Sequence, residues 1–150
     1  MAGVQIRPLA DGVRLEWRLP VEQLRQACKD SFAQQTTVDI WSPACSPPLA
    51  GLTWQLQVQC AQQDGGTVVG LYVGPCQLAA GVWYKCRCTA AWGGVKRSSR
   101  GTPAASLRGW DNFLALAPMA EGGWVDAVWA AEGQPTSGEM LLRLHVHSVG

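Results

Sequence analysis

The side chains of this chain that could do chemistry are its cysteines and histidines. Structural zinc sites usually show two Cys-x-x-Cys pairs, whereas the closest pair here, Cys86 and Cys88, has one residue between its members. That spacing puts both on one face of a strand, where they do not readily bridge each other. His145 and His147 also share one strand face, but no third ligand is near them in the sequence. We therefore expect no metal site and no cofactor.

The six cysteines could instead form three disulfides or stay reduced. The N-terminal segment contains Arg7 and Pro8 and no apolar run, so the chain shows no secretory signal. We expect a reducing, intracellular location, cytoplasmic or nuclear, where free cysteines behave as small buried hydrophobes. This role is expected for Cys28, Cys45, Cys60, Cys76, Cys86 and Cys88.

Nucleophilic catalysis lacks its usual sequence pattern. Serine, histidine and aspartate all occur, but there is no Gly-x-Ser-x-Gly turn, and both histidines lie close together near the C-terminus. No Cys–His pairing is indicated either. We expect the chain to have no catalytic residues and not to be an enzyme.

Positive charge is concentrated in one stretch of the chain. Six of the twelve Lys and Arg residues fall between Lys85 and Arg108, an interval without Asp or Glu. The formal net charge is only +1, so the whole chain has no general attraction for nucleic acid or anionic membrane. No run of about 18 apolar residues is present that could cross a membrane. We expect neither a membrane nor nucleic acid as the partner.

The elements that must position these groups are mostly strands, because apolar residues recur with a period of two. Leu52, Trp54, Leu56 and Val58, for example, alternate with polar residues that include three glutamines. A short helix is expected over residues 21–29, an irregular segment over 42–48, and a basic loop over 95–106. Strands are expected at residues 13–19, 36–41, 52–59, 67–73, 82–91 and 142–147.

These elements predict a single domain, residues 1–150, of the all-β class. The expected fold is an antiparallel β-sandwich of seven to eight strands, with one short helix after the first strand. The patterns around Trp17, Trp54 and Trp124 predict core positions for these three side chains. Phe113 and Leu114 are expected to enter the core after the basic loop.

Five short motifs occur in an order that resembles a known family. Trp17 on the first strand is followed by Ser-Pro and Gly-Leu-Thr-Trp, then by Gly-Leu-Tyr-Val, Leu-Arg-Gly-Trp and Gly-Trp-Val-Asp. The chain resembles a MATH domain, the meprin and TRAF-C homology module, over nearly its whole length. One departure lies at Trp110-Asp111-Asn112, where the family customarily has Trp-Gly-Phe, so one aromatic residue of the family's groove is missing.

The resemblance implies a TRAF-like sandwich that binds short extended peptide segments of partner proteins by strand addition. Tyr72, Arg108 and Trp110 match the family's groove positions, and Lys85 and Cys86 stand on a neighbouring strand. The tyrosine and tryptophan would supply apolar contact area, and Arg108, together with Lys85 or Arg87, would hold acidic or phosphorylated side chains. Many family members carry a BTB domain and select substrates for cullin-type ubiquitin ligases, so a BTB and cullin assembly is the second implied partner.

Two alternatives from other classes stay open. A structural or oligomerising sandwich without a peptide groove would pair its apolar surface with a second copy of the chain. A sandwich that binds carbohydrate or nucleic acid would expose Trp83 and Trp92 as stacking platforms.

Overall fold

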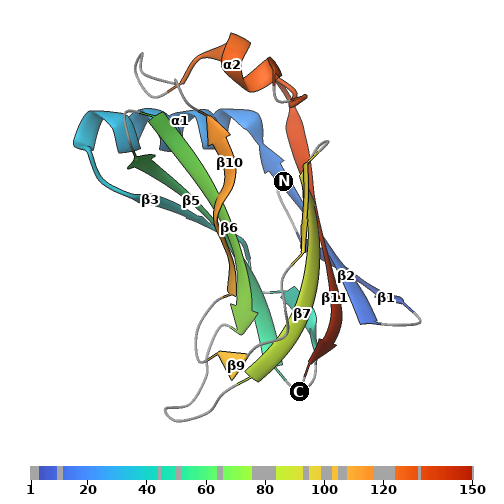
Figure 1. The fold of residues 1–150 in the computed structure, drawn as a ribbon. Helices are drawn as coiled ribbons and strands as arrows, with labels where there is room; N and C mark the ends of the chain where they lie inside the picture. Colours follow the sequence, from blue (N-terminus) through green and yellow to red (C-terminus); the bar gives the residue numbers. More distant parts are fainter. Residues whose placement is uncertain are drawn as a thin grey trace.

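The fold is known from a computed structural model. It describes residues 4–9, 12–43, 45–49, 52–63, 66–75, 84–92, 95–98, 103–104, 108–116, 124–131 and 133–149. Over these residues the chain forms two antiparallel sheets that face each other, and two helices lie at one end of them (Figure 1). The prediction of an all-β antiparallel sandwich is therefore confirmed.

Sheet A is organised around its two central strands. β2 and β11 pair from Pro20 opposite Glu139 to Val13 opposite Val146, so inward and outward residues alternate in step on both strands. The order across the sheet is β1 (Val4–Leu9), β2 (Gly12–Pro20), β11 (Glu139–Val149), β7 (Tyr84–Trp92) and β8 (Val95–Ser98), and β9 (Pro103–Ala104) pairs with β7.

Sheet B is organised around its two longest strands. β5 and β6 pair without interruption from Trp54 opposite Pro75 to Gln63 opposite Gly66. The order is β10 (Arg108–Leu116), β6 (Gly66–Pro75), β5 (Leu52–Gln63) and β3 (Val38–Trp41), and β4 (Cys45–Leu49) also pairs with β5. β10 and β3 are thus the terminal strands of the main path.

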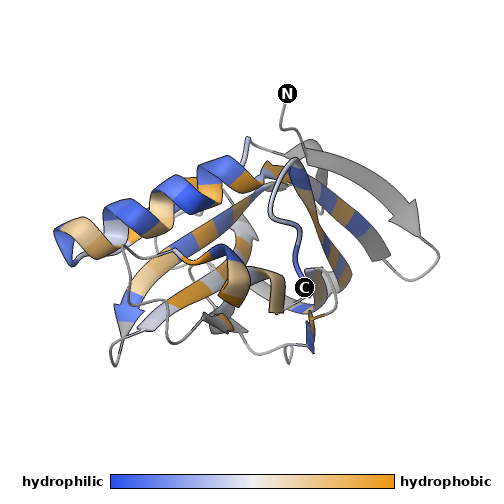
Figure 2. Cartoon of the chain, turned by 90° about the horizontal axis from the view of Figure 1, so that it is seen from above, coloured by the Kyte–Doolittle hydropathy of each residue, from blue (hydrophilic) through white to orange (hydrophobic). Residues whose placement is uncertain are grey.

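The core lies between the two sheets because each contributes one apolar face (Figure 2). Trp17 and Trp54 are buried there as the sequence predicts, and Trp124 is also buried. Burying a side chain as large as leucine or phenylalanine contributes about 1.5–3 kcal/mol, so these rows of side chains supply most of the driving force for folding. The largest fully buried side chains are Trp17, Trp54, Trp92, Trp129 and Phe113.

Helix α1 (Val21–Gln34) begins directly after β2. Pro20 is extended and stands at the N-cap, where its missing N–H is no loss. The helix ends because Gln35 is left-handed, with a φ of 49°, and its N–H bonds back to the last turn. The buried stripe consists of Val21, Leu24, Ala27, Cys28 and Ser31.

A helix forms where it is predicted over residues 21–29, but it is longer than predicted. The prediction that it follows the first strand is wrong. It continues to Gln34 because Ser31 extends the buried stripe by one more turn. It follows the second strand, because β1 precedes β2 and pairs with it from Val4 opposite Trp17 to Leu9 opposite Gly12.

The expected count of seven to eight strands is also too low. The structure has eleven strands within the described residues, six in sheet A and five in sheet B. β4 occupies part of the segment expected to be irregular, and β8 occupies the start of the expected basic loop. Strands this short offer too few positions for a period of two to be recognised, and only their pairing partners define them.

Arg25 of α1 contacts residues on both sides of helix α2 (Asp126–Ala131). The Arg25 guanidinium carbon lies 5.5 Å from the ring centre of Trp124, and Arg25 Nη2 donates to Thr136 O at 2.8 Å. Trp124 Nε1 donates to Asp126 Oδ1 at 2.7 Å. This hydrogen bond, reinforced by the charge of Arg25, lowers the pKa of the Asp126 carboxyl.

Replacing a core tryptophan should be far more damaging than replacing an exposed one. Trp92 is fully buried, 6.1 Å from Phe113 and 6.2 Å from Trp129 between ring centres. We expect Trp92→Ala to lower the free energy of unfolding by about 3–5 kcal/mol in urea denaturation followed by circular dichroism. The control Trp41→Ala removes a side chain that is 49% exposed and should change it by less than about 0.5 kcal/mol. Equal losses would contradict the placement of the core.

The Asp126 contact predicts an acid-sensitive α2 segment. A carboxyl whose pKa is lowered by folding contributes stability above its unfolded pKa, about 3.9, and this stability is lost as the pH falls through the folded pKa. The Trp124 indole N–H signal in a ¹H–¹⁵N NMR spectrum should therefore shift below about pH 4. In Asp126→Asn this titration should disappear. An indole signal that titrates identically in both proteins would refute the contact.

Candidate functional site

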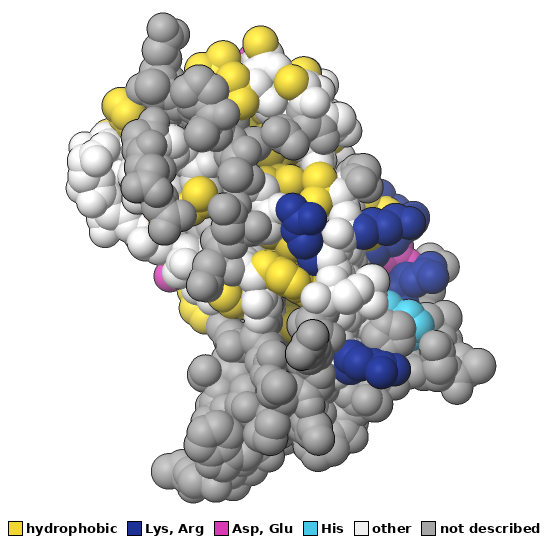
Figure 3. Space-filling view, viewed as in Figure 1, with side chains coloured by type: hydrophobic (Ala, Val, Ile, Leu, Met, Phe, Trp, Pro, Cys, Tyr) yellow, Lys and Arg dark blue, Asp and Glu magenta, His cyan; other side chains and the backbone are white. Residues whose placement is uncertain are grey.

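The outer faces of the two sheets differ in charge. On sheet A, cations on three adjacent strands and on β8 point outward, and Figure 3 shows them gathered along one side of the molecule. Glu16 lies among them, with its Oε2 3.6 Å from Arg143 Nε. We call this surface the basic face, and its described cations are Arg14, Arg18, Arg87, Lys96 and Arg143.

The outer face of sheet B is nearly uncharged around its centre. Gln57 and Gln59 alternate on β5 with the buried Val58, and Tyr72 lies directly opposite Gln57 on β6. Asp39 is the acidic side chain here, and Gln59 Nε2 donates to its Oδ1 at 3.2 Å. We call this surface the glutamine face, which consists of Trp41, Gln55, Gln57, Gln59 and Tyr72 with the glycines beside them.

One row of residues crosses the glutamine face from edge to edge. Trp41 pairs with Gln57, Gln57 with Tyr72, and Tyr72 with Gly109. Strands lie about 4.8 Å apart, so the tryptophan and the tyrosine stand about 10 Å apart with the glutamine between them. The row places an aromatic residue on either side of an amide.

The Tyr72 ring lies flat on the sheet over Gly70. A Cβ placed on Gly70 would be 2.9 Å from the ring and 3.0 Å from the hydroxyl, so only glycine leaves room for this conformation. The hydroxyl donates to Gln59 Oε1 at 3.4 Å, which holds the ring down from its far end. Tyr72 is half-buried, and a ring lying in this way presents one face outward.

Trp110 points to the opposite side of sheet B from Tyr72. It pairs with the fully buried Leu71, and its ring packs edge-on against Phe113 with 5.5 Å between ring centres. Its Nε1 donates to Ser98 O in β8, at 3.4 Å. Trp110 therefore joins the terminal strands of the two sheets, and the structure does not bring it onto one surface with Tyr72.

The other three predicted site residues are placed only by their strands. Arg108 pairs with Val73 in sheet B, whereas Lys85 and Cys86 belong to β7 in sheet A. Their side chains lie outside the described residues. The five predicted residues are thus divided between two sheets.

Three residues of the glutamine face were missed as site candidates. The alternating glutamines of residues 52–59 signalled an uncharged outer face, so Gln57 and Gln59 could have been found. Trp41 could not, because its exposure follows from the position of β3 at the edge of sheet B. Conversely, Trp92, offered as an exposed stacking platform, is fully buried, and that prediction is wrong. Trp83 lies outside the described residues.

The start of the segment expected to be a basic loop, β8, contributes to the core boundary instead. Arg97 in β8 pairs with Ala90, which faces inward, and its guanidinium carbon is 5.9 Å from the ring centre of Phe113. Its Nη2 donates to Phe113 O at 3.5 Å. Arg97 therefore holds β8 against β10, where the sandwich closes.

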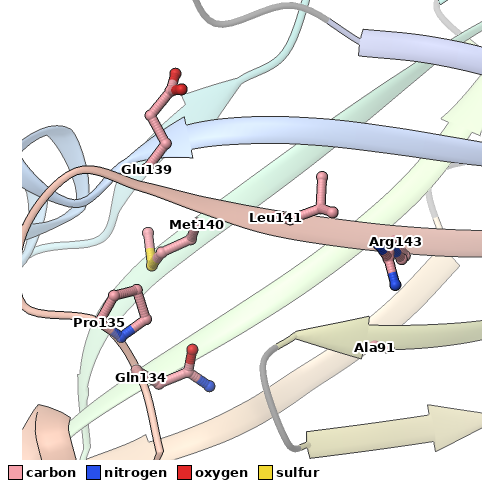
Figure 4. A pocket seen from close by; sticks show the side chains of 7 residues that line it. All are labelled: Ala91, Gln134, Pro135, Glu139, Met140, Leu141 and Arg143. Atoms are coloured by element: carbon pink, nitrogen blue, oxygen red, sulfur yellow. The ribbon is translucent and has the colours of Figure 1, made fainter.

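A pocket of about 250 Å³ opens beside the start of β11 (Figure 4). Gln134 lines it and is 5% exposed. Its Nε2 donates to Trp92 O at 2.9 Å, and its Oε1 has no hydrogen-bond donor among the described residues. Arg143 and the apolar Pro135 and Met140 also line the pocket.

The described residues contain neither a candidate metal-ligand cluster nor a candidate membrane-spanning helix. They contain no group of three or more His, Cys, Asp and Glu side chains that could hold a metal ion. His145 faces outward on β11, and the side chain of His147 lies outside the described residues. No helix of the described part is long and apolar enough to cross a membrane.

No protein-family model matches the chain, and no curated protein matches it either.

The close approach of β10 to β6 at the end of the row requires glycine. A Cβ on Gly109 would stand 2.0 Å from Leu71 O and 2.7 Å from Tyr72 Cα, so alanine must push the strands apart. We expect Gly109→Ala to lower the free energy of unfolding by about 1–3 kcal/mol in urea denaturation.

The comparison variant for this prediction is Gly133→Ala. Gly133 has a φ of 76°, and a Cβ added there would meet nothing within 4 Å, so alanine introduces backbone strain of about 1 kcal/mol and no clash. A Gly109→Ala protein as stable as the wild type would show that β10 does not approach β6 this closely.

Proposed function

We propose that this domain is a protein-interaction module that binds short extended segments of partner proteins at the β10 end of the glutamine face. The observation that carries the proposal is the flat Tyr72 ring, held over Gly70 and next to the side-chain-free Gly109. The MATH-like motifs of the sequence support the same type of function. A non-catalytic role is part of the proposal.

The geometry favours strand addition along β10. β10 is a terminal strand of sheet B, so a ligand backbone can pair with its outer edge. Gly109 lies between that edge and Tyr72 and has no side chain to block the way. A ligand side chain that points over Gly109 can therefore reach the tyrosine ring.

The chemistry of the face sets the kind of segment that fits. Glutamine side chains donate and accept hydrogen bonds, and an aromatic ring offers apolar area at a small entropic penalty. Gln57 and Gln59 flank the ring, and the described part of this face carries Asp39 as its charged group. A segment with an apolar side chain between uncharged polar ones suits this surface. Arg108 shares the register of Trp110 and not that of Tyr72, so a preference for an acidic or phosphorylated residue is not part of this proposal.

The family resemblance extends the proposal to a cellular role. Peptide capture of this kind would make the domain the substrate-recognition part of a BTB and cullin ubiquitin-ligase assembly. This extension depends on the peptide-binding activity and is tested after it.

A second candidate function is carbohydrate binding at the same face. The observation that favours it is Trp41, which is 49% exposed and stands in one row with Gln57 and Tyr72. Sugars stack on aromatic rings and take hydrogen bonds from amides, and two rings about 10 Å apart span two sugar units. Strand addition at β10 does not need Trp41, because β3 lies at the other end of the sheet.

The test is a peptide array probed with the wild type and with two variants. Tyr72→Ala should weaken every peptide captured at a Kd of about 1–100 μM by about tenfold, which corresponds to the loss of one aromatic contact. Trp41→Ala should leave these affinities unchanged. A glycan array run in parallel should stay blank, and light scattering should show that the variants keep the oligomeric state of the wild type.

Two results would contradict the proposal. One is a Tyr72→Ala protein that folds normally by circular dichroism and binds the same peptides with unchanged affinity. The other is a glycan bound by the wild type and lost in both variants, which would favour the carbohydrate alternative.

A further inference from the structure

Two cysteines from distant parts of the chain meet inside the protein. Cys28 lies on the buried stripe of α1 and Cys60 on the inner face of β5, and their Sγ atoms are 3.5 Å apart. Both side chains are fully buried. Cys28 and Cys60 are not joined by a disulfide in this structure.

The elements around the pair hold the two sulfurs face to face. One helical turn beyond Cys28, Ser31 Oγ accepts a hydrogen bond from Gln62 Nε2 of β5 at 3.3 Å. β5 is fixed in turn, since Cys60 pairs with Val38 on one side and with Val69 on the other. A disulfide bond is about 2.05 Å long, so the sulfurs need to approach by only about 1.5 Å.

We propose that Cys28 and Cys60 form an oxidative modification site, at which a peroxide converts the two thiols into one disulfide between α1 and β5. One sulfur first attacks a peroxide oxygen: an S–O bond forms, the O–O bond breaks, and the departing oxygen takes up a proton and leaves as water. The second sulfur then attacks the first, so that an S–S bond forms, the S–O bond breaks and a second water leaves. Two thiols are oxidised and one hydrogen peroxide is reduced.

The environment of the pair makes this reaction slow in the folded state. The hydrogen bond with Cys28 raises the pKa of the Cys60 thiol, and burial raises it further. Thiolates are the reactive form, so attack requires α1 to move away from β5 for a time. The same burial protects the product, and a reductant reaches the disulfide only through the same opening.

The cross-link restrains a particular part of the fold. It closes a loop with a sequence separation of 32 residues, which contains β3 and β4. A closed loop reduces the entropy of the unfolded chain, so the oxidised protein is the more stable one. The melting temperature should rise by several degrees on oxidation and fall back after dithiothreitol is added to the partly unfolded protein.

The site can be mapped by peptide mass spectrometry of the full chain. The reduced protein is exposed to hydrogen peroxide for several hours, alkylated under denaturing conditions and cleaved after basic and aromatic residues. Cys28 is released between Arg25 and Lys29, and cleavage after Trp54 and Tyr72 separates Cys60 from Cys45 and Cys76. We expect the Cys28 and Cys60 peptides to be linked, and the yield to increase in mild denaturant.

Matched variants separate this linkage from general oxidation. Cys28→Ser and Cys60→Ser should both lose the linked peptide and the rise in melting temperature. Cys88→Ser removes another buried cysteine and should keep both. Two results with the wild-type protein would overturn the proposal, whatever the variants do. One is that Cys28 is still a free thiol after the peroxide treatment and is recovered fully alkylated. The other is that Cys28 is linked to a cysteine other than Cys60.

Discussion

Two sheets with one apolar face each can hide those faces from water only by packing against each other, and this requirement governs the structure. The inner faces of β2 and β11 meet those of β5 and β6, and tryptophans from both sheets fill the space between them. Any one-residue slip of a central strand would turn its apolar side chains outward, so the registers are fixed by burial. α1, α2 and Arg97 then close the openings that two stacked sheets leave at their ends and edges.

The outer faces of the two sheets do not have to be buried, and they differ in charge. On sheet A, arginines on neighbouring strands surround Glu16, which produces a basic surface. On sheet B, Gly70 leaves room for the Tyr72 ring to lie on the sheet beside glutamines, and Gly109 lets β10 approach the backbone of β6 closely. Glycine within a strand weakens it, and at Gly70 this weakness is the condition for the conformation of the tyrosine ring. The proposed peptide site thus occupies residues that the core does not need.

The alternation of apolar and polar residues predicted the strands that have one buried and one outward face. The alternation around Trp17 and Trp54 predicted both strands and their buried sides, because one residue in two must face the core. β1, β4 and β8 escaped prediction, because a short edge strand is defined by a distant partner. The site shows the same limit: the glutamines were visible in the sequence, but Trp110 was grouped with Tyr72, whereas the pairing of Trp110 with Leu71 turns it to the other side of the sheet.

The proposed function requires that a ligand lies along β10 and touches Tyr72. Its most direct test is ¹H–¹⁵N NMR of the labelled protein during titration with a peptide selected for binding. We expect the shifted backbone amides to cluster on β10 and β6 around Gly109 and Tyr72, and the amide signals of β2 and β11 on the basic face to remain unshifted. Shifts centred on β2 and β11, with β6 and β10 unchanged, would contradict it.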